Sequence, residues 1–219
     1  MNLLNQFKAA SLLSLISVSV FAQTAIDLEP PTYKAGDTWT WAVKVSPRDQ
    51  CTTSILPGAK TTHTVEKVTD MNYRVAVLGP NTGQSFTRGL NKDLTFSSTT
   101  NTGNTANDVT VKSKLLNFPL KADDAWDTSL AGGNVVTTLN CKVAKAESLA
   151  INGQELQVTP VVCTGRWKNL SSGNNNQSIY KYWYSPKVGN FVRQTVFTYW
   201  ERGTCVDVEW QLESYKLAD

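Results

Sequence analysis

Apolar and polar residues alternate with a period of two along most of this chain, which is typical of β-strands that bury one face. The alternation is clearest over residues 38–45, 72–77 and 206–213. Residues 188–200 carry apolar groups on both faces, as expected for a strand in the middle of a sheet. Helical periodicity is nearly absent after residue 22. We therefore predict an all-β, mainly antiparallel protein.

Turn-forming residues separate the alternating runs, and Asn152-Gly153 is the strongest of these signals because both residues tolerate positive φ. Short turns between strands favour consecutive hairpins, and these predict a curved sheet, a half-barrel or a sandwich. Two polar stretches, residues 97–108 and 169–178, consist mainly of Ser, Thr, Asn and Gly. Their composition predicts exposed, mobile loops.

One short pattern, K-A-x-D-x-W, occurs twice, at residues 34–39 and 121–126. Each copy places a turn before a tryptophan that opens a predicted strand. Two interpretations are open: the chain consists of two similar halves, or the same device for entering a strand is used twice.

The first 22 residues have the three zones of an export signal. A polar start with Lys8 precedes an apolar stretch, and Val20-Phe21-Ala22 places small residues before the cleavage site. The apolar stretch, about 13 residues, is shorter than the roughly 20 that cross a bilayer, which argues against a membrane anchor. We predict a signal peptide at 1–22 and a single antiparallel β domain at 23–219. The mature chain would have no membrane span and would be periplasmic or secreted.

Four cysteines, Cys51, Cys141, Cys163 and Cys205, follow the predicted cleavage site, and an oxidising compartment favours disulfides. Folding the chain at Asn152-Gly153 brings Cys141 to within about one residue of facing Cys163. This register predicts a Cys141–Cys163 disulfide and leaves Cys51 with Cys205. The alternative, a zinc site, lacks a C-x-x-C motif and has one histidine. We therefore expect no metal and no cofactor.

The formal net charge is +3, and Lys and Arg form no dense cluster. This distribution argues against a nucleic acid as partner. Seven Trp and seven Tyr form a heavy aromatic load. Aromatic side chains of this kind serve either core packing or a binding face.

Three motifs together resemble a group of exported bacterial proteins of unknown function. They are Gly-Asp-Thr-Trp-Thr-Trp at 36–41, Phe118-Pro119-Leu120 followed by Trp126, and Tyr-Trp-Tyr-Ser-Pro-Lys-Val-Gly-Asn-Phe-Val-Arg at 182–193. Some of these families are similar to lipoprotein carriers with a curved β-sheet. The resemblance implies a curved sheet that could hold an apolar ligand or a lipoprotein segment, and it implies no catalytic residue.

The residues that a concave sheet would turn toward such a ligand are aromatic. The candidate ligand contacts are Tyr180, Tyr182, Trp183, Tyr184, Trp39 and Trp41. Along residues 179–184 the three tyrosines share one face, and Trp183 lies on the other with Ile179 and Lys181. A packed hairpin with no ligand is the alternative interpretation.

Catalytic groups are sparse. His63 is the only histidine, no G-x-S-x-G motif occurs, and the carboxylate pairs Asp123-Asp124 and Glu209/Glu213 lie in a predicted turn and on a predicted wet face. We therefore expect a non-catalytic periplasmic or secreted binding module whose partner is a lipid, a lipoprotein or an envelope protein. A protein- or glycan-interaction module of the cell envelope is the alternative, and a hydrolase is the remote one.

Overall fold

The computed structural model describes residues 27–45, 58–68, 73–78, 85–94, 96–100, 109–111, 114–132, 134–199 and 205–219. The predicted signal peptide lies outside them. The described residues form strands and no helix. In chain order the strands are β1 (Thr38–Val45), β2 (Lys60–Val68), β3 (Tyr73–Leu78), β4 (Ser85–Leu90), β5 (Phe96–Thr100), β6 (Val109–Val111), β7 (Ala125–Gly132), β8 (Val135–Val143), β9 (Glu147–Ile151), β10 (Gln154–Asn169), β11 (Asn175–Ser185), β12 (Asn190–Tyr199) and β13 (Cys205–Lys216).

The strands make one antiparallel sheet in the order β5-β4-β3-β2-β1-β13-β12-β11-β10-β8-β7-β6, with β9 paired to β10. Most neighbours in this order are consecutive hairpins, as predicted. Two neighbouring pairs are not consecutive. β8 pairs with β10, with β9 between them in the chain, and the first strand joins the last because β1 pairs with β13 from Thr38↔Lys216 to Val45↔Val208. No ladder of the described residues joins β5 to β6, so the sheet is not closed into a barrel. The predicted all-β, antiparallel fold is confirmed.

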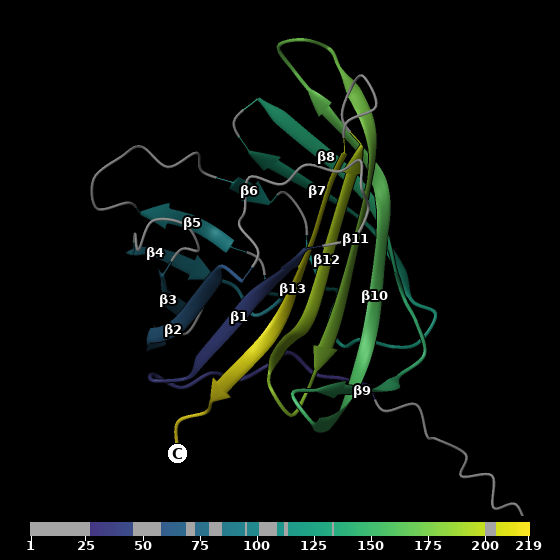
Figure 1. Cartoon of the computed structure of the whole chain (residues 1–219). Coiled ribbons are helices and arrows are strands. Elements are labelled where there is room, and N and C mark those ends of the chain that lie inside the picture. The colour runs from purple at the N-terminus through teal and green to yellow at the C-terminus, as the bar shows by residue number, and fades with distance from the viewer. Residues whose placement is uncertain are drawn as a thin grey trace, which may run out of the picture.

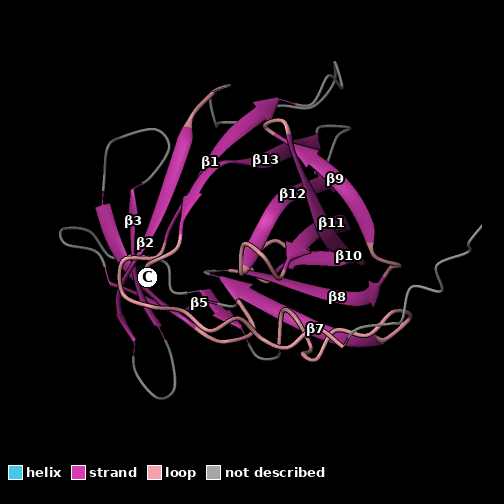
Figure 2. Cartoon of the chain, turned by 90° about the horizontal axis from the view of Figure 1, so that it is seen from below, coloured by secondary structure: helices cyan, strands magenta, loops and turns pink. Residues whose placement is uncertain are grey.

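The sheet is strongly curved. Its long strands β8 and β10–β13 bend around an interior, which is visible from the side in Figure 1 and from below in Figure 2. We call the face toward this interior the inner face and the opposite one the outer face. An extended segment before β1 meets the chain before β7, where Leu28 and Leu120 form an antiparallel bridge. The buried core lies on the inner face, between the sheet and these two segments.

Strand β12 matches its predicted pattern, and strand β13 matches in part. β12 lies between β11 and β13, as its two apolar faces indicated. On β13, Val208 and Leu212 are buried, whereas Glu213 is exposed. The predicted buried face is therefore confirmed at these two residues, whereas the face predicted to be wet is half-buried at Asp207, Glu209 and Gln211.

The prediction of exposed loops in the two polar stretches holds for residues 170–174, which form a largely exposed turn, and is wrong for residues 97–100 and 175–178, which belong to strands. Residues 97–100 belong to β5, and residues 101–108 lie outside the described residues. Asn175 opens β11, and Ser178 is fully buried on that strand. Composition misled here because pairing with β10 and β12 overrides the low β propensity of Asn and Ser.

The repeated K-A-x-D-x-W pattern forms the same turn twice. In each copy the aspartate N–H donates to the lysine carbonyl at 3.1 Å, and the residue before the aspartate, Gly36 or Asp123, has positive φ of 97° or 70°. Each turn then pairs with the next strand, through Val65 in the first copy and Val143 in the second. The two copies therefore share one turn geometry and one way of entering a strand, which fits both interpretations of the repeat.

The Asn152-Gly153 turn closes the lower end of the interior. Both residues have positive φ, and they connect β9 to β10 as predicted. The Asn152 side chain reaches across to β13, where its amide donates to the carbonyls of Leu212 at 3.0 Å and Glu213 at 2.7 Å. These carbonyls lie at a bulge of β13, where its register against β1 shifts. The hairpin tip is thereby attached to a strand on the far side of the interior.

Substitutions at Asn152 should separate its two roles, which are to adopt positive φ in the turn and to hydrogen-bond β13. Asn152→Gly keeps the positive φ and removes the amide, so we expect a loss of about 1 kcal/mol in the free energy of unfolding. Asn152→Ala also strains the backbone and should cost about 2 kcal/mol in total. Urea unfolding measures both values. Equal stability of the wild type and both variants would contradict the attachment to β13.

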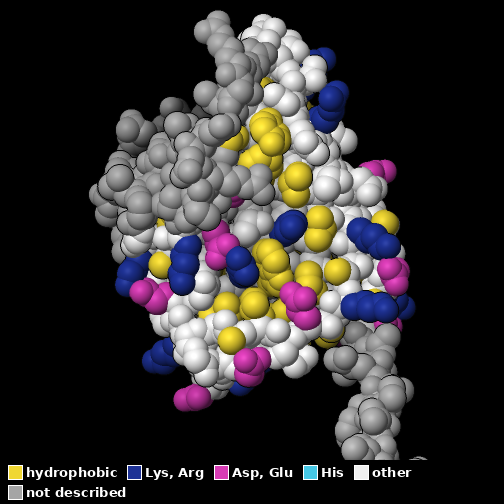
Figure 3. Space-filling view, turned by 45° about the vertical axis from the view of Figure 1, so that its right-hand side comes forward, with side chains coloured by type: hydrophobic (Ala, Val, Ile, Leu, Met, Phe, Trp, Pro, Cys, Tyr) yellow, Lys and Arg dark blue, Asp and Glu magenta, His cyan; other side chains and the backbone are white. Residues whose placement is uncertain are grey.

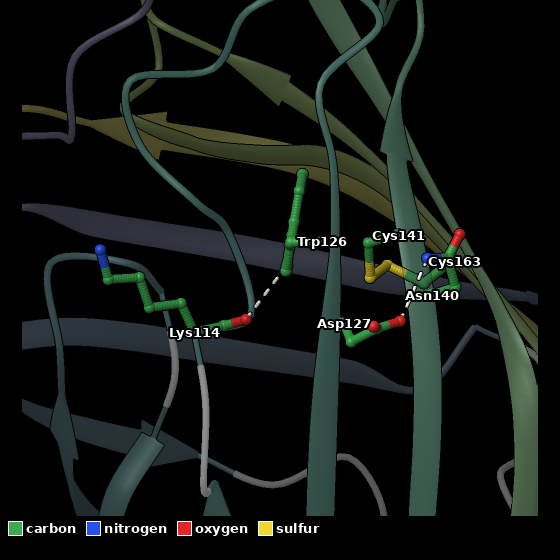
Figure 4. Close-up of a disulfide and its surroundings, with 6 residues drawn as sticks. All are labelled: Lys114, Trp126, Asp127, Asn140, Cys141 and Cys163. Carbon is green, nitrogen blue, oxygen red and sulfur yellow. Dashed lines mark hydrogen bonds between the residues drawn. A yellow bond between two sulfur atoms is a disulfide. The ribbon is translucent and has the colours of Figure 1, made fainter.

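The structure contains the predicted Cys141–Cys163 disulfide, which joins β8 to β10 on the inner face (Figure 4). The β9–β10 register continues into the β8–β10 register with a shift of one residue, and this shift places Cys141 directly opposite Cys163. Two residues further along β10, a Cβ on Gly165 would lie 1.9 Å from the Thr138 carbonyl oxygen, so only glycine fits there. Cys205 is also disulfide-bonded. Its predicted partner, Cys51, lies outside the described residues.

Candidate functional site

The two most specific sequence motifs hold each other in place. Trp39 and Trp41 of β1 donate their indole N–H groups to the carbonyls of Val188 at 2.9 Å and Phe191 at 2.8 Å. The Tyr33 hydroxyl donates to the carbonyl of Gly189, between them, at 2.8 Å. These carbonyls belong to the β11–β12 turn and the start of β12. Three aromatic donors from residues 33–41 therefore hydrogen-bond the carbonyl groups of the turn that follows the Tyr-Trp-Tyr-Ser-Pro block.

Four of the six candidate ligand contacts are buried in the core. Trp39 is 0% exposed, Trp41 7%, Tyr182 3% and Tyr184 1%. Tyr182 packs on Phe191, with ring centroids 4.8 Å apart, and Tyr184 meets Phe118 edge-on at 5.3 Å. Burial raises the pKa of both tyrosines, so their hydroxyls stay protonated at physiological pH. A ligand could reach these four rings only by displacing core side chains.

Trp183 lies on the outer face, as its position in the alternation predicted. Its indole N–H donates to the Glu147 carboxylate of β9 at 2.9 Å, and the Arg193 guanidinium lies 5.0 Å from the centre of its ring. Arg193 in turn bonds Glu209 of β13 at 2.6 Å. Figure 3, which brings the side with β9 and β10 forward, shows hydrophobic side chains gathered between acidic and basic ones. The Trp183 indole N–H and one terminal nitrogen of Arg193 are thus already engaged, whereas the buried Nε of Arg193 has no hydrogen-bond partner among the described residues.

Tyr180 differs from the other tyrosines because it is only half-buried and stands among hydroxyl groups. The inner face carries three buried hydroxyl side chains around it: Thr137 of β8, Ser178 of β11 and Thr198 of β12. Ser178 and Thr198 oxygens lie 3.2 Å apart. We call these three residues and Tyr180 the hydroxyl cluster.

Two opposing effects act on the pKa of the Tyr180 phenol. Burial raises its pKa, while side-chain hydrogen bonds with Thr137, Ser178 and Thr198 act in the opposite direction, and burial dominates. Its ring is stacked on Tyr182, with centroids 6.4 Å apart. The hydroxyl is therefore a neutral donor and acceptor at physiological pH, at the border between the apolar core and a hydroxyl-lined part of the inner face.

Register explains how side chains from separated strands reach one another here. Strand β10 lies between β8 and β11, and the β10 residue paired with both Leu139 and Ser178 is Gly165. Because glycine has no side chain, nothing on β10 at this level separates Ser178 from β8. The sequence did not reveal this cluster. Its signal was the pair of small polar residues, Ser178 and Thr198, at inward positions of strands that are otherwise apolar.

The groups weighed for catalysis lie apart from the hydroxyl cluster. The His63 ring on β2 meets Trp41 edge-on, with centroids 4.8 Å apart. Asp123 pairs with Lys142 at the surface, and Glu213 pairs with Lys60. Within the described part of the chain, no group of three or more His, Cys, Asp or Glu could hold a metal ion.

Similarity to known proteins is found among solved structures. No protein-family model matches the chain, and no curated protein matches it. Among solved structures it is similar to a "putative lipoprotein" from Parabacteroides distasonis, with 12% identity, a TM-score of 0.47, and coverage of 88% of this chain and 99% of that one. It is also similar to a "putative exported protein with YmcC-like fold" from Bacteroides fragilis, with 13% identity, a TM-score of 0.45, and coverage of 88% and 99%.

A third similar structure is the hypothetical lipoprotein YmcC from Escherichia coli, with 12% identity, a TM-score of 0.45, and coverage of 84% of this chain and 85% of that one. No family is assigned.

Proposed function

We propose that the chain is an exported, non-catalytic binding module of the cell envelope, and that its ligand is an apolar molecule with a polar head group. The observation that supports this is the hydroxyl cluster. Buried hydroxyls cost free energy unless they are hydrogen-bonded, and a sheet that served packing alone would have apolar side chains there. Export itself is supported by the sequence of residues 1–22 and by the disulfide.

The inner face around the cluster matches the two parts of such a ligand. Leu130, Trp126 and Tyr180 are half-buried and offer apolar surface beside the cluster. The hydroxyls offer neutral donors and acceptors. Since none of the four cluster residues is charged, they suit an ester, an amide or a protonated acid better than a bare anion.

The test is ligand uptake by the protein purified after expression of its full sequence. We expect native mass spectrometry to detect a bound lipid and a fluorescent fatty-acid derivative to bind. Tyr180→Phe removes one hydroxyl and should weaken binding about fivefold, because a hydrogen bond contributes about 1 kcal/mol. Tyr199→Phe, an exposed tyrosine on the next strand, is the matched control and should bind as the wild type does.

Two results would overturn the proposal. One is the absence of both a co-purified lipid and probe uptake. The other is equal loss of binding in Tyr180→Phe and Tyr199→Phe. Recovery of an envelope protein or glycan on an affinity column, with no lipid, would instead support the alternative of an interaction module.

A further inference from the structure

We propose that the end of the β10–β11 hairpin is a membrane-contact surface that binds the headgroup region of an anionic lipid bilayer. This surface is separate from the hydroxyl cluster and goes beyond the function proposed above. The hairpin end projects at the top of Figure 1, away from the C-terminus. A groove of about 420 Å³ lies on its flank. Its lining residues are Val136, Thr138, Arg166, Trp167, Lys168, Leu170, Gly173 and Asn175.

The first argument is exposed apolar surface at a protruding end. Leu170 is 60% exposed and Tyr199 is 40% exposed. Both lie at this end of the sheet, because the Trp167 indole N–H, three residues before Leu170, donates to the Tyr199 carbonyl at 2.8 Å. A leucine at the tip and a tyrosine set back from it suit the apolar-to-polar gradient of a bilayer interface.

The second argument is charge. Arg166 and Lys168 are both exposed, and no residue lining the groove is acidic. From Asn169 to Gln177 the hairpin end carries no charged side chain, so nothing on it would repel lipid phosphates. Each cation near an anionic surface strengthens binding about fivefold. The combination of two basic side chains and a leucine that is 60% exposed favours a bilayer, which offers anionic headgroups and apolar chains at one interface.

The third argument is that hydrogen bonds already order the backbone of the turn that carries Leu170. The Asn169 side chain accepts hydrogen bonds from the N–H groups of Ser171 at 2.9 Å and Ser172 at 3.2 Å. The Leu170 N–H donates to the Asn134 carbonyl of the β7–β8 turn at 2.7 Å. Leu170 is therefore presented on a hydrogen-bonded turn, so its insertion would require little further ordering of the backbone.

Vesicle co-sedimentation tests the proposal. The protein should bind vesicles of phosphatidylcholine with phosphatidylglycerol more strongly than vesicles of phosphatidylcholine alone, and added salt should weaken binding. Arg166→Gln with Lys168→Gln should lower the partition coefficient about thirtyfold, and Leu170→Ser several-fold. Circular dichroism checks that the variants are folded.

Matched controls lie at the opposite end of the sheet. Lys34→Gln with Lys216→Gln makes the same change in net charge, and Leu217→Ser changes a leucine that is 43% exposed. We expect both controls to bind as the wild type does. The proposal is overturned if the wild type does not prefer anionic vesicles, if the controls lose as much binding as the hairpin variants, or if an acidic peptide with an apolar residue competes fully at the groove.

Discussion

Replacing Trp39 by alanine is expected to lower the free energy of unfolding by about 4 kcal/mol, the largest effect of any single substitution we consider. Trp39 is 0% exposed, its indole N–H bonds the Val188 carbonyl at 2.9 Å, and Tyr33 packs edge-on against it with centroids 5.1 Å apart. The change removes a large buried side chain and leaves both a cavity and an unpaired carbonyl. Urea unfolding monitored by circular dichroism measures the loss.

Two further variants divide this effect into its parts. Trp39→Phe keeps most of the apolar volume and removes the hydrogen bond, so we expect a loss of about 2 kcal/mol. Trp183→Phe is the control, because it makes the same chemical change on the outer face, where the indole bonds an exposed Glu147. It should cost less than about 1 kcal/mol. If Trp39→Ala cost no more than Trp183→Phe, the linkage of β1 to the β11–β12 turn would not contribute to stability.

Much of the fold could be predicted from the sequence because alternation, turns and register act locally. The Asn152-Gly153 turn gave the partner of Cys141, and the two apolar faces of β12 indicated a central strand. The pairing of β1 with β13 could not be predicted, since alternation does not say which distant strand lies alongside. The polar stretch at 169–178 misled for a related reason: Ser178 is buried by neighbouring strands that its own composition does not reveal.

The candidate site was predicted less well than the fold. Aromatic residues were expected to face a ligand, but aromatic composition is the same in a core and in a binding surface. What distinguishes them is the partner of each polar atom. The indole N–H groups of Trp39 and Trp41 are used by backbone carbonyls, whereas the hydroxyl of Tyr180 stands among other side-chain hydroxyls. Such contacts between strands depend on register, on curvature and on Gly165.

Removing the Cys141–Cys163 disulfide is expected to cost about 3 kcal/mol, the second large effect. The bond closes a loop between residues 22 apart, and the cross-link limits the unfolded chain by about this amount. A double variant, Cys141→Ala with Cys163→Ala, should therefore unfold at a lower urea concentration. The free energy of unfolding of this variant should also fall more steeply with urea concentration, because the unfolded chain exposes more surface without the cross-link.

Reducing agent provides the control for this prediction. Because Cys205 is also disulfide-bonded, a reductant acts on more than one bond in the wild type, and the double variant isolates the one between β8 and β10. Under oxidising conditions the wild type should be the more stable protein by about 3 kcal/mol. In reductant the two proteins should converge, apart from the small loss of buried volume at two alanines. If their unfolding midpoints coincide under oxidising conditions, the bond joins two strands that the rest of the sheet already holds at this register, and its contribution to stability is negligible.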